Sequence, residues 1–479
     1  MLFTEPTFLF LFLPVLLALY YAGRGRVWHN WLLLAASVLF YARGAGAFTA
    51  LVLSSIAFNY LAALAVDRWR GSPPGQWMLA GAITANLLVL LVFKYADFTI
   101  ANVNTAMAAF GAKPFALPHL LLPIGISFFT FHAISYVVDV YRRDASAQKR
   151  PVEAALYLLV FPQLIAGPIV RYRQIAGQLT SRATSVEDFS YGVRRFIVGL
   201  GKKMLVANTL AGPADRIFSM PAGELTAAHA WLAVVCYTLQ IYFDFSGYSD
   251  MAIGLGRMFG FRFPENFNYP YVAQSVQDFW RRWHMSLSAW FRDYVYIPLG
   301  GNRTSTGRLY FNLVLVFFLC GLWHGASWTF VIWGLFHGLF LVIERVGLAD
   351  RLERVPPVMR HAYLLLVVMV GWVFFRAETL SSAVAIFAAM AGFGGQLPTA
   401  YSPSWYLTPE VIVGLLAGVV GATPIVSLFQ RWRDTLSLDA PGRVVAWDAV
   451  GVATLAVVLI GSITQSAAGT YNPFIYFRF

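Results

Sequence analysis

The chain carries few charged residues. Of its 479 residues, 12% are charged, whereas 58% are hydrophobic and 16% are aromatic. A soluble domain carries about 25% charged residues, which cover its surface with polar groups. A chain with half that share cannot cover a globular surface in this way, whereas lipid can surround it. The composition excludes a soluble enzyme with a single anchor and predicts an integral membrane protein with many transmembrane helices.

Long polar blocks and a basic leader are also missing. The longest relatively polar stretches are 171–190, about 262–308 and 431–445. None is long enough to fold alone, so we expect one integral-membrane domain, residues 1–479. Residues 1–6 contain no Lys or Arg, whereas a secretory signal begins with a basic region. The first apolar run is therefore predicted to be a retained helix with its N-terminus outside.

Cysteine is scarce as well. The only two, Cys236 and Cys320, both lie inside apolar runs. A disulfide framework needs several cysteines at regular spacing, so none is expected here. A buried cysteine usually packs as a small hydrophobic residue.

Basic residues give the chain a net charge of +12 and cluster between apolar runs. Membrane orientation explains this pattern better than nucleic acid does, because cationic side chains resist translocation and accumulate in inside loops. With the N-terminus outside, the first five predicted spans leave only Arg43 and Lys113 in outside loops. The inside loops carry Arg24, Arg26, Arg68, Arg70, Arg142, Arg143, Lys149 and Arg150. We therefore expect these basic residues to orient the protein in the lipid bilayer, and we expect no nucleic acid partner.

Apolar runs long enough to cross a bilayer recur along the chain. A helix needs about 20 residues to cross ~30 Å of hydrocarbon. The predicted spans lie near 7–22, 29–42, 47–66, 77–97, 119–140, 152–168, 190–212, 226–245, 309–326, 327–346, 361–376, 379–393, 409–430 and 445–465. Two of them, 152–168 and 379–393, are short enough to be re-entrant. We expect about 10 to 13 true crossings.

The region 262–308 is too polar for lipid and too aromatic for an ordinary loop. Within it, apolar side chains recur at three- and four-residue spacing over 276–292, which predicts an amphipathic helix. Such a helix lies along an interface or enters a cavity within the protein. His284 falls on the border between its apolar and polar stripes. Residues 298–302 are predicted to be non-helical, which membrane depth tolerates only where protein or water surrounds them.

His324 is the sharpest candidate for chemistry. It follows the strongly apolar run 309–319 and has glycines at 321 and 325, so we expect it well inside the bilayer. A histidine can take a proton from a hydroxyl and hand one to a leaving group. Ionisable side chains inside membranes are often functional. The competing interpretation is that Gly321 and Gly325 form only a helix-packing surface.

His284 is the second candidate. Its segment also holds Arg281 and Arg282, which fit an anion. An interfacial helix with an aromatic belt and snorkelling arginines explains the same residues. His132 and His337 lie inside predicted spans and fit function or packing equally well.

The remaining histidines and the carboxylates have structural interpretations. The histidines at predicted span ends, where interfacial polar groups are common, are His29, His119, His229 and His361. Asp244 and Asp250 follow an apolar run, where an unpaired charge is costly. We expect both to be paired, with Arg257 and Arg262 as candidate partners. No metal-binding spacing occurs in the sequence.

Several segments, taken together, are similar to one family. They are 278–288, Asp-Phe-Trp-Arg-Arg-Trp-His-Met-Ser-Leu-Ser; 296–302, Tyr-Ile-Pro-Leu-Gly-Gly-Asn; and 322–325, Leu-Trp-His-Gly. In this order they resemble the membrane-bound O-acyltransferases. Further segments resemble the bacterial branch of that family that includes the alginate O-acetylation membrane subunit. These are 122–129, 161–169, 242–250 and the C-terminal 472–479.

The resemblance implies an all-α polytopic fold: a ring of helices, with re-entrant or interfacial helices, around a central funnel. It implies an O-acyltransferase with His324 as the catalytic histidine and His284 as the second motif residue. In that branch an acyl group, most often acetyl, passes from a cytoplasmic thioester toward a periplasmic acetyltransferase partner protein that modifies a polysaccharide. Acetyl-CoA is then the expected donor, with no permanently bound cofactor, and the bacterial inner membrane the expected location.

A basic rim is expected to attract the phosphates of that donor, although the positive-inside bias explains the same residues. The rim consists of Arg281, Arg282, Arg292 and Arg303, with Lys202 and Lys203. Acyl transfer also needs a donor for the oxyanion, for which Asn312, Ser327 and amides near Gly321 or Gly325 are candidates.

Two other functions remain as alternatives. One is D-alanyl transfer from a carrier protein to a cell-wall polymer. The other is a transporter or flippase, whose pathway His132, His324 and Asp244 would line. The absence of a convincing internal repeat weakens the transporter hypothesis, because many transporters consist of repeated halves.

Overall fold

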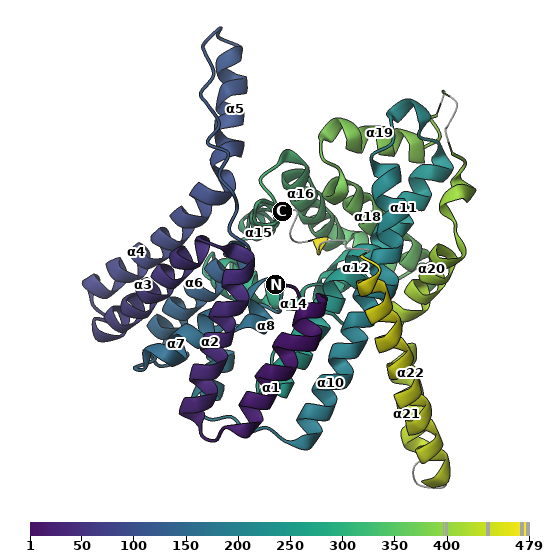
Figure 1. The fold of residues 1–479 in the computed structure, drawn as a ribbon. Coiled ribbons are helices and arrows are strands. Elements are labelled where there is room, and N and C mark those ends of the chain that lie inside the picture. Colours follow the sequence, from purple (N-terminus) through teal and green to yellow (C-terminus); the bar gives the residue numbers. More distant parts are fainter. Residues whose placement is uncertain (396, 398–400, 437–440, 470–473, 476–479) are drawn as a thin grey trace. The chain divides into compact units, whose positions relative to one another are not determined.

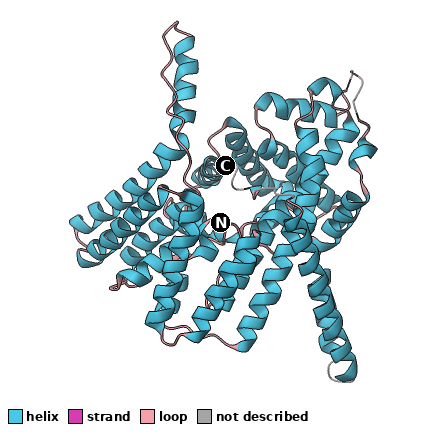
Figure 2. Cartoon of the chain, in the orientation of Figure 1, coloured by secondary structure: helices cyan, strands magenta, loops and turns pink. Residues whose placement is uncertain are grey.

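The computed structural model describes residues 1–395, 397, 401–436, 441–469 and 474–475, and this part of the chain forms helices and connecting loops without a strand (Figure 2). The predicted all-α fold class is therefore confirmed. Continuous helices satisfy their own backbone hydrogen bonds, which is the condition for a segment surrounded by lipid.

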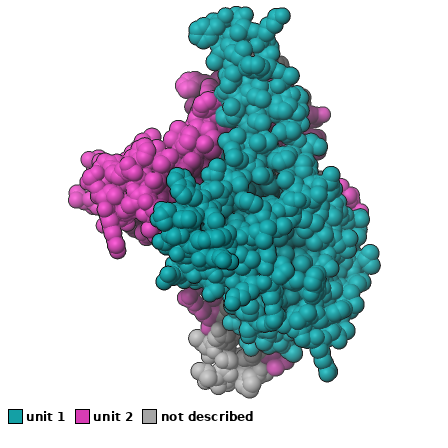
Figure 3. Space-filling view, turned by 90° about the vertical axis from the view of Figure 1, so that its left-hand side faces the viewer, with its two compact units in different colours: residues 1–193, 252–264 teal, residues 194–251, 265–479 magenta. Residues whose placement is uncertain are grey.

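The chain divides into two compact units, each made of two segments (Figure 3). Unit 1 consists of Met1–Val193 and Ala252–Pro264, and unit 2 of Arg194–Met251 and Glu265–Phe479. Helices α10 (Val186–Gly201) and α12 (Ala227–Met258) each pass from one unit into the other. The prediction of a single domain over residues 1–479 stays a prediction.

Unit 1 contains most of the N-terminal helices (Figure 1). Besides its parts of α10 and α12, its elements are η1 (Phe8–Phe12), α1 (Leu13–Ala22), α2 (Arg26–Ala45), α3 (Phe48–Arg68), α4 (Pro73–Leu90), η2 (Leu91–Tyr95), α5 (Ala96–Ala108), α6 (Ile126–Arg142), α7 (Pro151–Leu159), α8 (Phe161–Leu164) and α9 (Tyr172–Thr180).

Unit 2 contains both candidate histidines. Its elements are η3 (Lys202–Ala207), α11 (Asn208–Phe218), η4 (Ala222–Glu224), η5 (Pro270–Val272), α13 (Val276–Arg282), α14 (Met285–Phe291), η6 (Arg292–Tyr296), α15 (Thr306–His324), α16 (Trp328–Ile343), η7 (Glu344–Leu348), α17 (Ala349–Leu352), α18 (Pro357–Arg376), α19 (Leu380–Met390), η8 (Pro403–Tyr406), α20 (Pro409–Gly421), α21 (Ile425–Leu436) and α22 (Pro441–Ala467).

Among the described residues, six helices are long and apolar enough to cross a membrane. They are Phe48–Arg68, Pro73–Ala108, Thr306–His324, Trp328–Leu352, Pro357–Arg376 and Val445–Ala467. Three shorter apolar helices, Phe8–Ala22, Leu380–Met390 and Pro409–Gly421, accompany them. The protein is thus a multi-pass membrane protein, and the expected count of crossings stays a prediction.

Several predicted spans have different bounds in the structure, and two of them illustrate why. The span predicted at 119–140 begins at Ile126, because Gly125 takes a left-handed conformation (φ 75°) immediately before the helix. The segment 152–168 is not one helix but α7 and α8, which are interrupted at Val160. At 9 residues α7 covers about 14 Å, which agrees with a re-entrant segment.

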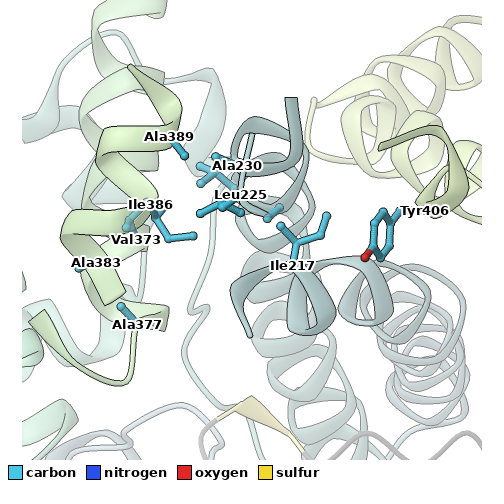
Figure 4. Close-up of a cluster of buried hydrophobic side chains, with 11 residues drawn as sticks. Ile217, Leu225, Ala230, Val373, Ala377, Ala383, Ile386, Ala389 and Tyr406 are labelled. Carbon is cyan, nitrogen blue, oxygen red and sulfur yellow. The ribbon is translucent and has the colours of Figure 1, made fainter. Parts of the chain in front are cut away.

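A cluster of buried apolar side chains holds one part of unit 2 together (Figure 4). Its members come from α11, α12, α18 and α19, from η8, and from the residues that follow η4 and α18. They are Ile217, Leu225, Ala230, Ala233, Val234, Val373, Ala377, Ala383, Ile386, Ala389 and Tyr406. From α19, Ala383, Ile386 and Ala389 contribute one face at three-residue spacing. Alanines let helices approach closely, which is how packing stabilises helix pairs in a bilayer.

Candidate active site

The predicted helix over 276–292 is wrong as one element, because the chain breaks at His284. Helix α13 ends at Arg282 and α14 begins at Met285. Between them His284 adopts a left-handed conformation (φ 43°, ψ 53°), which is uncommon for residues other than glycine and clusters at functional sites. The break is fixed from outside: Met285 N donates to Asn266 O at 2.9 Å and Asn268 N to Arg282 O at 3.0 Å.

Asn266 holds the ring of His284. Its Oδ1 accepts from Ser286 Oγ at 2.9 Å and lies 3.0 Å from His284 Nδ1, and its Nδ2 donates to Ser249 Oγ at 3.0 Å. A carbonyl oxygen only accepts, so His284 Nδ1 carries the hydrogen and Nε2 is the basic nitrogen. Sequence reasoning missed Asn266, which lies 18 residues from His284.

Burial also determines the charge of His284, which lies outside the six span candidates. The side chain is completely buried, and this burial lowers its pKa to about 3. A buried imidazole loses the hydration that stabilises its charged form. His284 is therefore neutral near pH 7.

His324 is the last residue of α15 and is 3% exposed. Its ring centroid lies 6.5 Å from that of His284, so unit 2 brings the two predicted histidines together. The ring also packs edge-to-face against Trp333 at 4.9 Å and Phe375 at 5.2 Å. Two neighbouring imidazoles in an apolar, buried setting match the chemistry of proton transfer to and from a substrate.

The glycines around His324 serve helix packing. A Cβ added to Gly321 would lie 2.4 Å from Phe330 O, and one added to Gly334 would lie 2.2 Å from Phe317 O. A Cβ on Gly325 would lie 2.1 Å from the ring of Phe330. These contacts show that the glycines allow close packing of α15 against α16, which places Trp333 against His324, while the function of His324 stays a prediction.

The predicted basic rim is only partly available for a ligand. Arg282 Nε donates to both carboxylate oxygens of Asp278 at 3.0 Å, and Arg292 Nε donates to Asp293 at 2.8 Å. Arg281 and Arg303 have exposed side chains. Phosphate binding by these arginines stays a prediction, and Arg281 and Arg303 are its better candidates.

The buried carboxylates are paired, but not with the partners that the sequence suggested. Asp244 binds Lys203 and accepts from Ile475 N at 2.8 Å. Asp250 binds Arg195 and Lys202, both at 2.7 Å. In unit 1, Arg257 and Arg262 instead bind Asp188. Glycines explain the choice. Gly199 of α10 and Gly247 of α12 let the two helices approach closely, which places the lysines at the start of η3 beside the carboxylates.

The other histidines divide into paired and unpaired rings. His132 Nε2 accepts from Val170 N at 3.3 Å, His229 lies 2.9 Å from Thr226 Oγ1, and His361 lies 3.1 Å from Ala273 O. These contacts favour structural roles. His337 is completely buried, and neither ring nitrogen has a hydrogen-bond partner in the described part of the chain.

Two further sequence expectations can be placed. Cys236 and Cys320 are buried free thiols. Of the C-terminal segment 472–479, only Phe474 and Ile475 belong to the described residues, and both are buried. The rest of that motif lies outside them.

Comparison with known proteins agrees with this geometry. Residues 124–376 match the model of the membrane-bound O-acyltransferase family, MBOAT. The match covers more than half of the chain and includes His284 and His324. The chain therefore belongs to the membrane-bound O-acyltransferase family and is an acyltransferase.

Curated relatives place the chain within this family. It is 43% identical to the probable alginate O-acetylase AlgI of Pseudomonas putida over the whole of both chains. It is 38% identical to the peptidoglycan O-acetyltransferase of Helicobacter pylori, over 82% of this chain and 80% of that one. It is also 30% identical to the teichoic acid D-alanyltransferase of Bacillus subtilis, over 57% and 69% of the two chains.

Proposed function

We propose that this protein transfers an acetyl group from a cytoplasmic thioester, acetyl-CoA, across the inner membrane for the O-acetylation of a cell-envelope or exopolysaccharide such as alginate. The observation that carries the proposal is the buried pair of His284 and His324, 6.5 Å apart, within a chain that is similar over its full length to a probable alginate O-acetylase. The acetyl group passes to a periplasmic acetyltransferase partner protein, which modifies the polysaccharide.

His324 acts as the base in this reaction. A hydroxyl is a weak nucleophile near pH 7, so its proton must leave as its oxygen attacks the thioester carbon. The proton moves to His324, the new carbon–oxygen bond forms, and the carbonyl oxygen becomes an oxyanion. When the oxyanion collapses, the carbon–sulfur bond breaks and the thiolate takes the proton from His324. Charge and protons balance, and the imidazole returns to its neutral form.

His284 contributes through its Nε2, since Asn266 holds Nδ1. A neutral imidazole accepts one hydrogen bond there. Since the attacking hydroxyl gives its single proton to His324, Nε2 of His284 accepts from another N–H or O–H of the bound substrate and so helps to position that substrate. Arg281 and Arg303, which are exposed, attract the donor's phosphates. In this arrangement the N-terminus is periplasmic, and the arginine-rich loops face the cytoplasm.

D-alanyl transfer from a carrier protein is the second candidate. It is supported by the 30% identity with a teichoic acid D-alanyltransferase, although this covers only 57% of the chain. The full-length similarity to alginate O-acetylases favours acetyl transfer.

Detergent-purified protein incubated with radiolabelled acetyl-CoA tests the proposal, with His324→Ala beside the wild type. We expect label release by the wild type and at least about a 100-fold loss in the variant. Full activity of a folded His324→Ala protein would exclude His324 as the base. Turnover of an acylated carrier protein, with none of acetyl-CoA, would favour D-alanyl transfer. Substrate flux into liposomes without acyl exchange would favour a transporter.

A further inference from the structure

Three buried rings beside His324 carry nitrogens with no hydrogen-bond partner in the described part of the chain. They are Nε1 of Trp280, Nε1 of Trp333 and both ring nitrogens of His337. Trp333 and His337 are 0% exposed, and Trp280 is 8% exposed. Buried polar groups are nearly always hydrogen-bonded, because losing water without gaining a partner is costly. Several such groups in one place indicate a site that binds a ligand.

The three rings form one contiguous group with the base. Trp333 packs against His324 at 4.9 Å and against His337 at 5.3 Å. Trp280 closes the group, at 5.2 Å from His337 and 5.8 Å from Trp333. The group begins at the catalytic histidine and continues one helical turn along α16.

A neighbouring indole shows that the fold supplies partners elsewhere. Trp372 stacks on Trp333 at 6.2 Å, and its Nε1 donates to Tyr271 Oη at 3.1 Å. Tyr271 in turn donates to Thr238 O at 2.5 Å. Trp372 therefore differs from Trp280 and Trp333, whose indole nitrogens have no hydrogen-bond partner in the described part of the chain.

The oxyanion donors that the sequence suggested are already engaged. Asn312 Nδ2 donates to Leu299 O at 3.1 Å, and Gly325 N donates to Gly321 O at 3.2 Å. Ser327 Oγ shares a hydrogen bond with Thr329 Oγ1 at 2.7 Å. Trp333 Nε1 is a donor beside the base, and among the residues that the structure describes it has no hydrogen-bond partner.

The ring chemistry defines the ligand. An indole nitrogen only donates, and a neutral imidazole donates once and accepts once. The group therefore suits a ligand with two carbonyl oxygens and one N–H. The pantetheine arm of an acyl thioester carries a thioester carbonyl and, two methylene groups beyond the sulfur, an amide. Trp333 and His337 are separated by one turn, about 6 Å along the helix, which suits these two groups.

We propose that Trp333, Trp280 and His337 form a subsite for the thioester carbonyl and the first amide of a pantetheine-linked acyl donor. The subsite rests on the proposed acyl transfer at His324. Trp333 donates to the carbonyl oxygen as negative charge develops there. Trp280 and His337 bind the amide and position the arm.

Phenylalanine substitutions test the subsite, because they keep an aromatic ring and remove the indole nitrogen, at the cost of a smaller ring volume. We expect Trp333→Phe to lower kcat about 100-fold, the cost of one oxyanion donor. Trp280→Phe is expected to raise KM about tenfold with a smaller change in kcat, because it removes a contact with the bound arm. All buried Trp→Phe variants lose ring volume, so their donor-free Tm should fall less in Trp333→Phe and Trp280→Phe, which break no hydrogen bond, than in Trp372→Phe, which does.

Trp372→Phe is the matched control, because it removes an indole nitrogen that has a partner. It should lower Tm and retain most of the activity. Each variant is assayed with acetyl-CoA and with an acetylated carrier protein, which share the pantetheine arm. The subsite is supported if each variant loses the same factor in kcat/KM with every acyl donor that the wild type uses.

Two results would overturn the subsite, and they are distinguishable. Wild-type kcat and KM in Trp333→Phe, in a protein that turns over acetyl-CoA, would exclude the subsite and leave the acyltransferase mechanism intact. A wild type that transfers label from neither donor would reject the proposed function and the subsite with it.

Discussion

At the scale of single residues, the tautomer of His284 is a consequence of Asn266. The amide oxygen accepts and the amide nitrogen is used by Ser249, so Nδ1 of His284 has to donate. Nε2 is therefore the ring nitrogen that accepts a hydrogen bond. Asn266 is thus a positioning residue, which acts through His284.

Replacing Asn266 by Asp should change the pH dependence of acetyl transfer. A carboxylate 3.0 Å from His284 Nδ1 would stabilise the imidazolium and raise the pKa of His284 from its depressed value. A higher pKa means that the ring is protonated at a higher pH, so the acidic limb of the kcat/KM profile should move to higher pH.

Asn266→Ala is the companion variant. It releases the ring, and a misplacement of about 1 Å costs about 100-fold in kcat. An acidic limb that stays in place in Asn266→Asp, together with normal kcat in Asn266→Ala, would exclude the positioning role. Gln76→Ala, which also removes an amide but at an exposed position in α4, serves as the control for both.

At the scale of elements, the pair of α15 and α16 depends on glycine. Gly334→Ala would place a methyl group 2.2 Å from Phe317 O. Because this oxygen belongs to the backbone, a change of side-chain rotamer cannot relieve the clash. We expect a loss of about 1–3 kcal/mol of stability and a loss of activity, because His324 and Trp333 face each other across this contact. Thermal unfolding in detergent measures the first effect and label transfer the second.

Gly307 supplies the control within α15, since a Cβ added there meets nothing within 4 Å. Gly307→Ala should leave stability unchanged or raise it by about 0.4–1 kcal/mol. Equal thermal stability of Gly307→Ala and Gly334→Ala would show that the contact at Gly334 is not a tight one.

Helix type and several spans were predictable at this scale, because apolar periodicity reports local structure. The break at His284 was not. Trp280, Trp283, Leu287 and Trp290 continue a helical spacing through it, and the hydrogen bonds that impose the break come from Asn266 and Asn268. Likewise His324 and His284 were found from their local motifs, whereas Asn266 and the unpartnered rings depend on contacts between distant segments.

At the scale of the whole molecule, buried charge joins distant parts of unit 2. Lys203 and Asp244 are each 2% exposed, and Asp244 also accepts from Ile475 N. Breaking a buried pair leaves one charge without compensation and costs about 3–5 kcal/mol, whereas removing both charges costs much less.

Lys203→Met should therefore lower Tm strongly, and the double variant Lys203→Met with Asp244→Asn should recover part of the loss. Arg262→Met, at an ion pair whose arginine side chain is 68% exposed, is expected to change little. Additive losses in the double variant would contradict a coupled pair.

Membrane topology can be tested because both native cysteines are buried. With the N-terminus periplasmic, Lys113→Cys should react with a membrane-impermeant maleimide on intact cells, and Arg143→Cys only after the cells are opened. The reverse pattern would invert the orientation that the loop charges predict.

Helices α10 and α12 each have residues in both units, and this has a consequence for the synthesis of the chain. Unit 1 needs Ala252–Pro264, and by the time the ribosome has made these residues it has already made Arg194–Met251 of unit 2. N-terminal domains usually fold first as the chain emerges. Here the N-terminal unit must wait for its last segment while the start of its successor is already present. A translational pause inserted after Pro264 should therefore raise the yield of folded protein more than a pause inserted after Val193.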